Sequence, residues 1–141
     1  MKSLLKWLAG IAFVGGLVVA LTTWPLIHDV ETGKSPEYPD LRVKEYAATP
    51  DRVAKALDRA LAGLPGWEVV GSGRGQASHS LQAVHTLSVV PLREEVSVRI
   101  WREGEKTRVS VRSRSRTSLP DLGQNARNIR ELQAALDREL S

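Results

Sequence analysis

The sequence contains no cysteine. That absence excludes disulfide bonds, thiolate metal sites and a cysteine nucleophile, and it is compatible with an oxidising compartment without establishing one. Large rings are also scarce, because the 141 residues include one Phe, two Tyr and four Trp. So few aromatic side chains argue against a large apolar cavity for a ligand.

Histidine is rare as well, with three residues in the chain. His79 and His85 lie on one predicted extended segment, about 20 Å apart at the rise of a strand, so they cannot share a metal ion. The chain lacks Gly-x-Ser-x-Gly, His-Glu-x-x-His and Walker-type motifs. The glycine-rich segment 71–75 is not followed by Gly-Lys-Ser/Thr, so it predicts a flexible turn or a bulge. We therefore predict no catalytic residue, no cofactor and no metal.

Charge is absent between Trp7 and Ile27. As a helix this segment would rise about 30 Å, the thickness of a hydrocarbon core. Lys2 and Lys6 precede it and acidic residues follow it, and positive flanks stay on the cytoplasmic side. Residues 1–28 are therefore predicted to be a transmembrane anchor. The chain would cross the inner (plasma) membrane once, with its N-terminus in the cytoplasm and its C-terminal domain in the periplasm or another extracytoplasmic space.

A cleaved signal peptide is the competing interpretation of the same segment. It also begins with a basic tip followed by an apolar core. Thr22, Thr23, Trp24 and Pro25 follow the apolar core, and they do not form the small-x-small pattern of a cleavage site. The sequence therefore favours a retained anchor, and the mass of the mature N-terminus decides between the two.

The remainder of the chain divides into a linker and one small domain. Residues 29–41 hold two prolines, a glycine and several small polar residues, which discourage regular structure. Residues 42–141 are enough for a single domain with a modest core. The net charge of the whole chain is +4, and the stretch from Arg93 to Arg116, with eight cations and four anions, carries the same balance.

Two amphipathic helices are predicted in this domain. The first starts at Pro50 with Thr49 as its N-cap, and Asp121 is a plausible N-cap for a second helix from about Leu122 to Leu140. Each has an apolar stripe at helical spacing. The predicted stripes are Val53, Ala56, Leu57, Ala60, Leu61 and Leu64, and Leu122, Ala126, Ile129, Leu132, Leu136 and Leu140.

Alternating and β-branched segments predict the strands. These are 42–47, 67–70 and 80–90, with Pro91 interrupting the last one. Segments 94–101 and 106–115 then form a hairpin around Glu103-Gly104. Two helices and an antiparallel sheet with one apolar face indicate an α+β fold of two layers.

The register of the hairpin determines its outer face. If Arg102 and Glu105 close a two-residue turn, the predicted apolar pairs are Ile100–Thr107, Val98–Val109 and Val96–Val111. The outer pairs are then Arg99–Arg108, Glu95–Arg112 and Arg93–Arg114. Opposed arginines repel each other unless water or an anionic partner lies between them. The candidate contacts for an anion or partner are Arg93, Arg99, Arg108, Arg112 and Arg114.

The stretch from Ser113 to Arg130 resembles the uncharacterised family "domain of unknown function 1499". Its members typically carry Ser-Arg, a short gap, Asp-Leu-Gly-x-Asn, a basic residue and Ile-Arg. The matching positions are Ser115, Arg116, Asp121, Leu122, Gly123, Asn125, Ile129 and Arg130. Segments 29–32, 38–41 and 81–83 are also similar to membrane-anchored members. Members often have aromatic residues before the penultimate strand, and segment 90–95 has none, so the resemblance implies fold and location rather than a pocket or an activity.

Four residues of this motif form a candidate structural or binding corner: Arg116, Asp121, Asn125 and Arg130. A polar cluster between a strand and a helix N-terminus could bind an anion. It could also be a clamp, in which Asp121 caps the helix, Asn125 satisfies backbone groups and an arginine pairs with Asp121. The second interpretation carries more weight.

The function predicted from these observations is that of a membrane-anchored, non-enzymatic accessory or interaction protein. Its partners would be the membrane, a protein of a membrane complex and an anionic lipid surface. Nucleic acid is disfavoured as a partner because aromatic residues do not interleave the arginines. The alternative is a small-ligand or lipid-binding module with a pocket between the sheet and the C-terminal helix.

Overall fold

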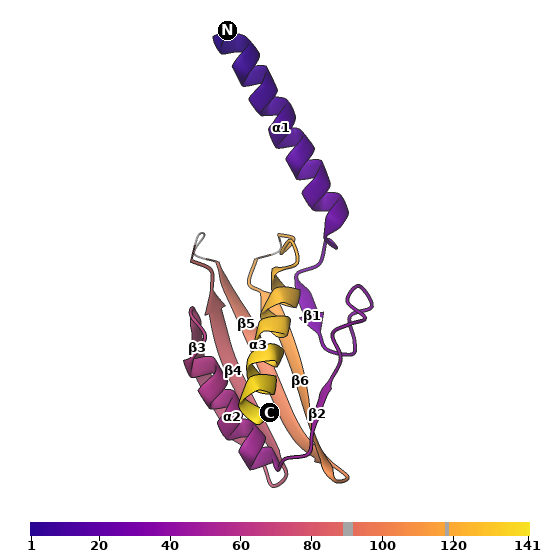
Figure 1. The fold of residues 1–141 in the computed structure, drawn as a ribbon, viewed down its shortest axis with the longest axis vertical. Coiled ribbons are helices and arrows are strands. Elements are labelled where there is room, and N and C mark those ends of the chain that lie inside the picture. The colour runs from indigo at the N-terminus through magenta and orange to yellow at the C-terminus, as the bar shows by residue number, and fades with distance from the viewer. Residues whose placement is uncertain (89–91, 118) are drawn as a thin grey trace.

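The computed structural model describes residues 1–88, 92–117 and 119–141 of the chain. An apolar helix, α1, leads into a domain built from six strands and two further helices (Figure 1). The elements are α1 Lys2–Thr23, β1 Asp29–Glu31, β2 Lys44–Tyr46, α2 Pro50–Ala62, β3 Trp67–Arg74, β4 Ser78–Thr86, β5 Arg93–Glu103, β6 Lys106–Ser115 and α3 Gln124–Leu140.

The first helix projects away from the rest of the molecule as a single rod (Figure 1). None of its side chains is buried, and it is long and apolar enough to cross a membrane, although a signal sequence has the same properties. It ends at Thr23, and Trp24 is already extended at φ −110° and ψ 138°. The extended conformation suits the residue before Pro25, because proline disfavours a helical predecessor.

All strand pairs of the sheet are antiparallel, in the order β1-β6-β5-β4-β3, and β2 also pairs with β6. Helices α2 and α3 lie side by side against one face of this sheet (Figure 1). The apolar N-terminal helix and the helix-covered antiparallel sheet confirm the prediction of an α+β fold.

The core lies between the sheet and the two helices. On β5 every second residue is buried, from Glu94 through Ile100, and the intervening residues face the side without helices. The predicted stripe of α2 is buried from Val53 to Leu61. In α3 the buried part of the stripe is Ala126, Ile129, Leu132 and Leu136. These side chains fill the interface between the layers, where the alternative function had required a pocket.

The predicted register of the β5–β6 hairpin is wrong by two residues. Glu103 pairs with Lys106, so the turn is Gly104-Glu105 rather than Glu103-Gly104. Gly104 has φ +61°, as the first central residue of a type II′ turn requires. A shift of two residues keeps every side chain on its predicted face but changes its partner. Arg114 now lies opposite Glu95, and the predicted arginine pairs do not form.

The segment interpreted as a linker contains a strand. β1 pairs with β6, and Val30 is completely buried at 0% exposure. Thr32 continues the contact, because its Oγ1 accepts a hydrogen bond from the backbone N–H of Val111 at 3.1 Å. Leu41 at the end of the segment is also in the core. Prolines and glycine turn the chain between these points without preventing it from packing.

The boundaries of the other elements differ in detail from the predictions. The Thr49 hydroxyl caps α2 by accepting from the backbone N–H of Arg52 at 3.3 Å, as predicted. The predicted end of β3 is Val70, but the strand continues through the glycine-rich segment to Arg74, and its register with β4 shifts between Val69 and Gly71, at the start of that segment. α3 begins two residues later than predicted, at Gln124. The predicted interruption at position 91 lies outside the described residues.

Candidate functional site at the α1-proximal end

Two connections meet at the end of the domain nearest α1. The described parts of the β4–β5 connection (residues 87, 88 and 92) and of the β6–α3 corner (residues 116, 117 and 119–123) lie at the same end, because Glu94 pairs with His85 on one side and with Ser115 on the other. The C-terminal end of α1 lies beside the β6–α3 corner (Figure 1). We call this region the α1-proximal end, and the hairpins β3–β4 and β5–β6 form the opposite end.

Five residues join α1 to β1, and several of them are fixed on the corner. The carbonyl of Ile27 accepts from the backbone N–H of Asp121 at 3.3 Å, and the carbonyl of His28 accepts from that of Ser115 at 2.9 Å. Trp24 packs so closely on Gly123 that an added Cβ would lie 2.5 Å from the indole. The connection between α1 and the domain is therefore short and hydrogen-bonded to the β6–α3 corner.

Beneath the corner lies a buried network of polar side chains. Ser113 Oγ donates to Asn125 Oδ1 at 2.7 Å, and Asn128 Nδ2 donates to Glu94 Oε2 at 2.5 Å. Asn125 Nδ2 reaches the carbonyl of His28 at 3.1 Å and Ser115 Oγ at 3.0 Å. Ser113 and both asparagines are 0% exposed and Glu94 is 2% exposed. The network therefore ties the tether, two strands and α3 together without solvent.

Burial shifts the acid and the base of this region toward their neutral forms. Desolvation raises the pKa of Glu94, against the hydrogen bonds from Asn128 and Ser115 that lower it. Desolvation also lowers the pKa of His85, the residue paired with Glu94 on β4. The Nδ1 atom of His85 is buried without a hydrogen-bond partner among the described residues.

The corner itself is held by Asp121. Its carboxylate accepts from the backbone N–H of Gly123 at 2.9 Å and from that of Asn125 at 2.7 Å. Asp121 thus caps the first turn of α3 from outside the N-cap position, which Gly123 occupies at φ +79°. Leu122 between them has φ +49°, a left-handed conformation that costs a leucine about 1–2 kcal/mol. That conformation leaves the side chain of Leu122 40% exposed.

A pocket of about 340 Å³ opens between the two connections. Its apolar wall comes from four leucines, and its charged groups come from three arginines and from the carboxyls of Glu94 and Asp121. The leucines are Leu87, Leu92, Leu119 and Leu122, and the arginines are Arg93, Arg116 and Arg127. The arrangement offers cations beside apolar surface, which suits an amphiphilic anion.

The structure brings together three of the four predicted corner residues. Arg116 and Asp121 line the pocket, and Asn125 lies directly beneath it. Arg116 pairs with Glu95 at 2.8 Å rather than with Asp121. Arg130 lies elsewhere on α3. It pairs with Asp40 at 2.9 Å and its guanidinium lies 5.5 Å from the ring centre of Tyr38, so it holds the segment before β2.

Sequence reasoning missed Glu94, Asn128 and His85 as members of this site. A signal for Glu94 was present, because it shares the parity of the inward-facing residues of β5. A carboxylate at an inward position is unusual unless it has partners or a function. Its partner on α3 was not visible from spacing, because Asn128 is 34 residues away along the chain.

The five arginines proposed as partner contacts are placed on the sheet face without helices, and most have internal partners. Arg112 is bonded to Asp29, and Arg114 to Glu95 at 3.2 Å. The pKa of Glu95 is lowered by its hydrogen bonds with Arg114 and Arg116. Arg108 pairs with Glu45 at 3.0 Å. Two members remain: Arg99 lies over Trp101, and Arg93 is exposed beside the pocket. This face therefore carries a network of ion pairs, and little uncompensated charge remains along the middle of β6.

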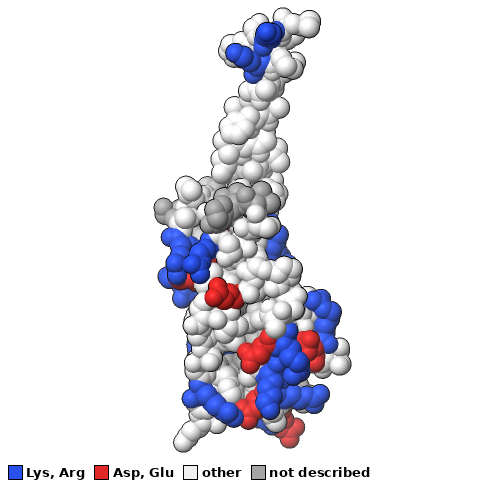
Figure 2. Space-filling model, turned by 90° about the vertical axis from the view of Figure 1, so that its left-hand side faces the viewer, with Lys and Arg blue, Asp and Glu red and all other residues white. Residues whose placement is uncertain are grey.

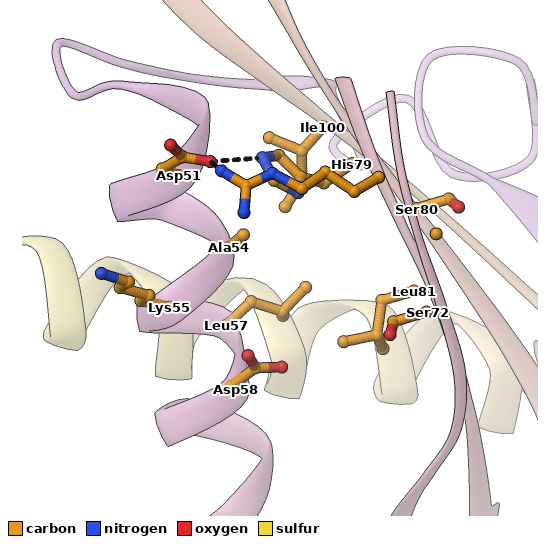
Figure 3. A pocket seen from close by; sticks show the side chains of 12 residues that line it. Asp51, Ala54, Lys55, Leu57, Asp58, Ser72, His79, Ser80, Leu81 and Ile100 are labelled. Carbon is orange, nitrogen blue, oxygen red and sulfur yellow. Dashed lines mark hydrogen bonds and ion pairs between the residues drawn. The ribbon is translucent and has the colours of Figure 1, made fainter. Parts of the chain in front are cut away.

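A second cleft of about 390 Å³ lies between α2 and strands β3 and β4, toward the opposite end (Figure 3). Asp51 at its mouth accepts from Arg74 Nη2 at 2.7 Å and approaches His79 Nε2 at 2.8 Å. These three groups satisfy one another across the opening. Among residues 1–88, 92–117 and 119–141, no group of three or more acidic or histidine side chains is arranged to hold a metal ion. The α1-proximal pocket is the stronger candidate.

Comparison with known families identifies the family to which the chain belongs. The model of a protein family described as "Protein of unknown function (DUF1499)" matches residues 21–136. The chain belongs to the DUF1499 family. The match covers the tether, the sheet and most of α3, so the buried network and the α1-proximal pocket both lie inside the DUF1499 region. The resemblance inferred from the Asp-Leu-Gly-x-Asn motif is thereby confirmed.

Solved structures give only distant likenesses to this DUF1499 protein. The crystal structure of TTHA0849 from Thermus thermophilus is 18% identical, covers 79% of this chain and 96% of its own, and has a TM-score of 0.38. The crystal structure of Ara h 8.0201 is 12% identical, covers 80% of this chain and 97% of its own, and has a TM-score of 0.33. No conclusion about ligand or activity follows from similarities of this size. A search of curated proteins finds no match.

Proposed function

We propose that this protein is a membrane-anchored, non-enzymatic interaction module. In this proposal α1 stays in the inner membrane with its N-terminus in the cytoplasm. The domain lies on the outer side, against a membrane complex or an anionic surface. The observation that carries the proposal is the hydrogen-bonded joint between the base of the apolar rod and the β6–α3 corner.

Helix length supports a position of the domain close to the bilayer. The uncharged helical part from Trp7 to Thr23 rises about 26 Å, less than the roughly 30 Å of a hydrocarbon core. The extended residues Trp24 to Ile27 would complete the crossing, with the Trp24 ring in the headgroup layer that such rings prefer. Because Ile27 is bonded to the corner, the α1-proximal end would lie at headgroup depth.

The chemistry of the site supports interaction rather than catalysis. The buried polar side chains are bonded to one another and to the tether, which is the arrangement expected of a structural clamp. Arginines and leucines make up half of the lining residues of the pocket, and its two carboxyls, Glu94 and Asp121, are held by hydrogen bonds within the domain. Arginines and leucines on a surface bind anions and apolar groups, and they do not supply a general base or a nucleophile.

The absence of cysteine allows a direct test of topology. Single variants Ser3→Cys and Gln76→Cys would be treated with a membrane-impermeant maleimide in intact cells and after lysis. We expect labelling of position 76 in intact cells and of position 3 only after lysis. Mass spectrometry of the mature N-terminus and extraction with alkaline carbonate complete the test. A chain that begins after residue 20, or that carbonate removes from vesicles, contradicts the anchor.

The α1-proximal pocket favours a second candidate function, the binding of a small ligand or lipid. Its volume of about 340 Å³ accommodates a small ligand or one headgroup. The pocket lies at the end of the layers, where β5, β6 and the first turn of α3 all contribute lining residues. Native mass spectrometry of detergent-extracted protein separates the two functions. Co-purified protein subunits support the interaction module, and a retained small molecule or lipid supports the binding module.

A further inference from the structure

Exposed apolar side chains of the domain gather at the α1-proximal end. From Trp24 onward, six large apolar residues among the described residues are highly exposed, and four of them lie at this end. These four are Leu26 at 63%, Leu92 at 41%, Leu119 at 69% and Leu122 at 40%. They come from the tether and from both connections, so only the folded chain brings them together.

Cations lie beside these leucines. Arg93, Arg116 and Arg127 line the same pocket, and Arg127 donates to the carbonyl of Leu122 at 3.0 Å. Arg116 also pairs with Glu95 at 2.8 Å, but Glu95 is shared with Arg114 and the pair is open to solvent, so its charges are only weakly bound to each other. The Asp121 carboxylate is turned inward to two backbone N–H groups. Figure 2 shows cationic side chains at the tip of α1, a stretch of α1 without charge, and charged residues again over the domain. A lipid bilayer has the same sequence of polar, apolar and polar layers.

Leu122 supplies an independent observation. A leucine in a left-handed conformation is strained, and here the strain places an apolar side chain in water. The hydrogen bonds of Asp121 and Arg127 hold the backbone of the corner in this conformation. The exposure of the side chain has a use if it is buried against an apolar layer outside the domain.

We propose that the α1-proximal end docks on the bilayer that holds α1. Leu92, Leu119 and Leu122 enter the interfacial layer, and Arg93 and Arg116 contact the phosphates of anionic phospholipids, with one headgroup in the pocket. The inference rests on the proposed membrane anchor and adds the surface that the domain contacts. The charge and the apolar surface are both complementary to such a membrane.

Depth-dependent quenching of the full chain tests the docking. A Leu119→Cys variant carrying an environment-sensitive fluorophore would be reconstituted in vesicles of phosphatidylcholine with about 30% phosphatidylglycerol. Lipids spin-labelled near the headgroup should quench this fluorophore strongly. The same fluorophore on Gln76→Cys, in the hairpin at the opposite end, should not be quenched. Leu92→Cys provides a second position if labelling at 119 disturbs the fold.

A matched pair of double variants tests the role of the arginines. Arg93→Gln with Arg116→Gln removes two cations from the pocket, and Arg99→Gln with Arg102→Gln removes two cations from the opposite half of β5. Each arginine near an anionic surface favours the docked state by a factor of about five. We therefore expect the ratio of docked to undocked domain to fall about 25-fold in the first variant and little in the second.

Vesicle flotation separates the two ways of failing. Protein that does not float with the vesicles contradicts the anchor and the docking together. Protein that floats while the fluorophore at position 119 is not quenched overturns the docking alone. Equal quenching in pure phosphatidylcholine, or equal losses in both double variants, overturns the role given to anionic lipid and to these arginines.

Discussion

Asn125 is the residue whose replacement tests the clamp most directly. Its amide accepts from Ser113 and donates to the His28 carbonyl and to Ser115 Oγ, and it is completely buried. Replacement by alanine removes the three hydrogen bonds and leaves their partners in a dry site. Because the His28 carbonyl belongs to the tether, the loss would loosen the joint between α1 and the domain.

The size of the expected destabilisation follows from the groups that lose Asn125 as their hydrogen-bond partner. Each buried polar group without a hydrogen bond costs about 1–3 kcal/mol. Ser113 Oγ keeps a hydrogen bond from Asn128 at 3.2 Å, and the His28 carbonyl keeps the one from the Ser115 N–H, so neither partner is left wholly unsatisfied. We therefore expect Asn125→Ala to lower the free energy of unfolding by about 2–4 kcal/mol. For a domain of this size that corresponds to a fall in Tm of about 10–20 °C.

Thermal unfolding in detergent, followed by tryptophan fluorescence and circular dichroism, measures this change. Gln76→Ala is the matched control, because it removes an exposed amide from the hairpin at the opposite end, and its Tm should stay within about 2 °C of the parent. Asn125→Asp should destabilise about as much as Asn125→Ala, since it keeps an acceptor but removes both donors. If Asn125→Ala melts within about 3 °C of the parent protein, the network does not hold the corner and our reasoning about it is wrong.

Three further predictions concern the same region. Glu94→Gln should raise Tm near about pH 7 and change it little near about pH 4. The reason is that burial raises the folded pKa of Glu94 above 4.5, so the protonated form that stabilises the fold is lost as pH rises. An equal change in Tm at both pH values would contradict this. Gly123→Ala should lower the free energy of unfolding by about 1–2 kcal/mol and shift the tryptophan emission, because Gly123 has φ +79° and the new Cβ would collide with the Trp24 indole. Gly10→Ala is the control, because Gly10 has open space around it, and both measurements should stay unchanged for the domain. Val30→Ala should cost about 2 kcal/mol in a denaturation experiment if the predicted linker is part of the core, and Val70→Ala, 55% exposed, should cost much less.

Several elements could be predicted because their signals are local. The Thr49-Pro50 pair determines the start of α2 whatever surrounds it, and the apolar stripe at helical spacing determines which face is buried. The alternation along β5 and β6 likewise determines which side chains point to the core. The DUF1499 motif was recognisable because its residues are contiguous in the sequence.

Other features could not be predicted because they depend on distant residues. The hairpin register is set by one glycine, and a turn beginning at Gly104 was as compatible with the apolar pattern as one ending there, since both keep the same face. Val30 lies among polar residues, and only pairing with β6 shows that it is buried. Glu94 and Asn128 meet because the sheet and α3 pack against each other.

The amino-acid sequence by itself determined the apolar rod, the two amphipathic helices, the one-sided sheet and the family. Each of these depends on interactions between residues a few positions apart, so the pattern along the chain is sufficient. Only the tertiary structure decided that the arginines of the open sheet face are mostly paired and that the tether is bonded to the β6–α3 corner. It also decided that leucines from two connections meet beside Arg93 and Arg116. Those outcomes depend on strand register and helix docking, which bring together groups up to 97 residues apart and which no local pattern encodes.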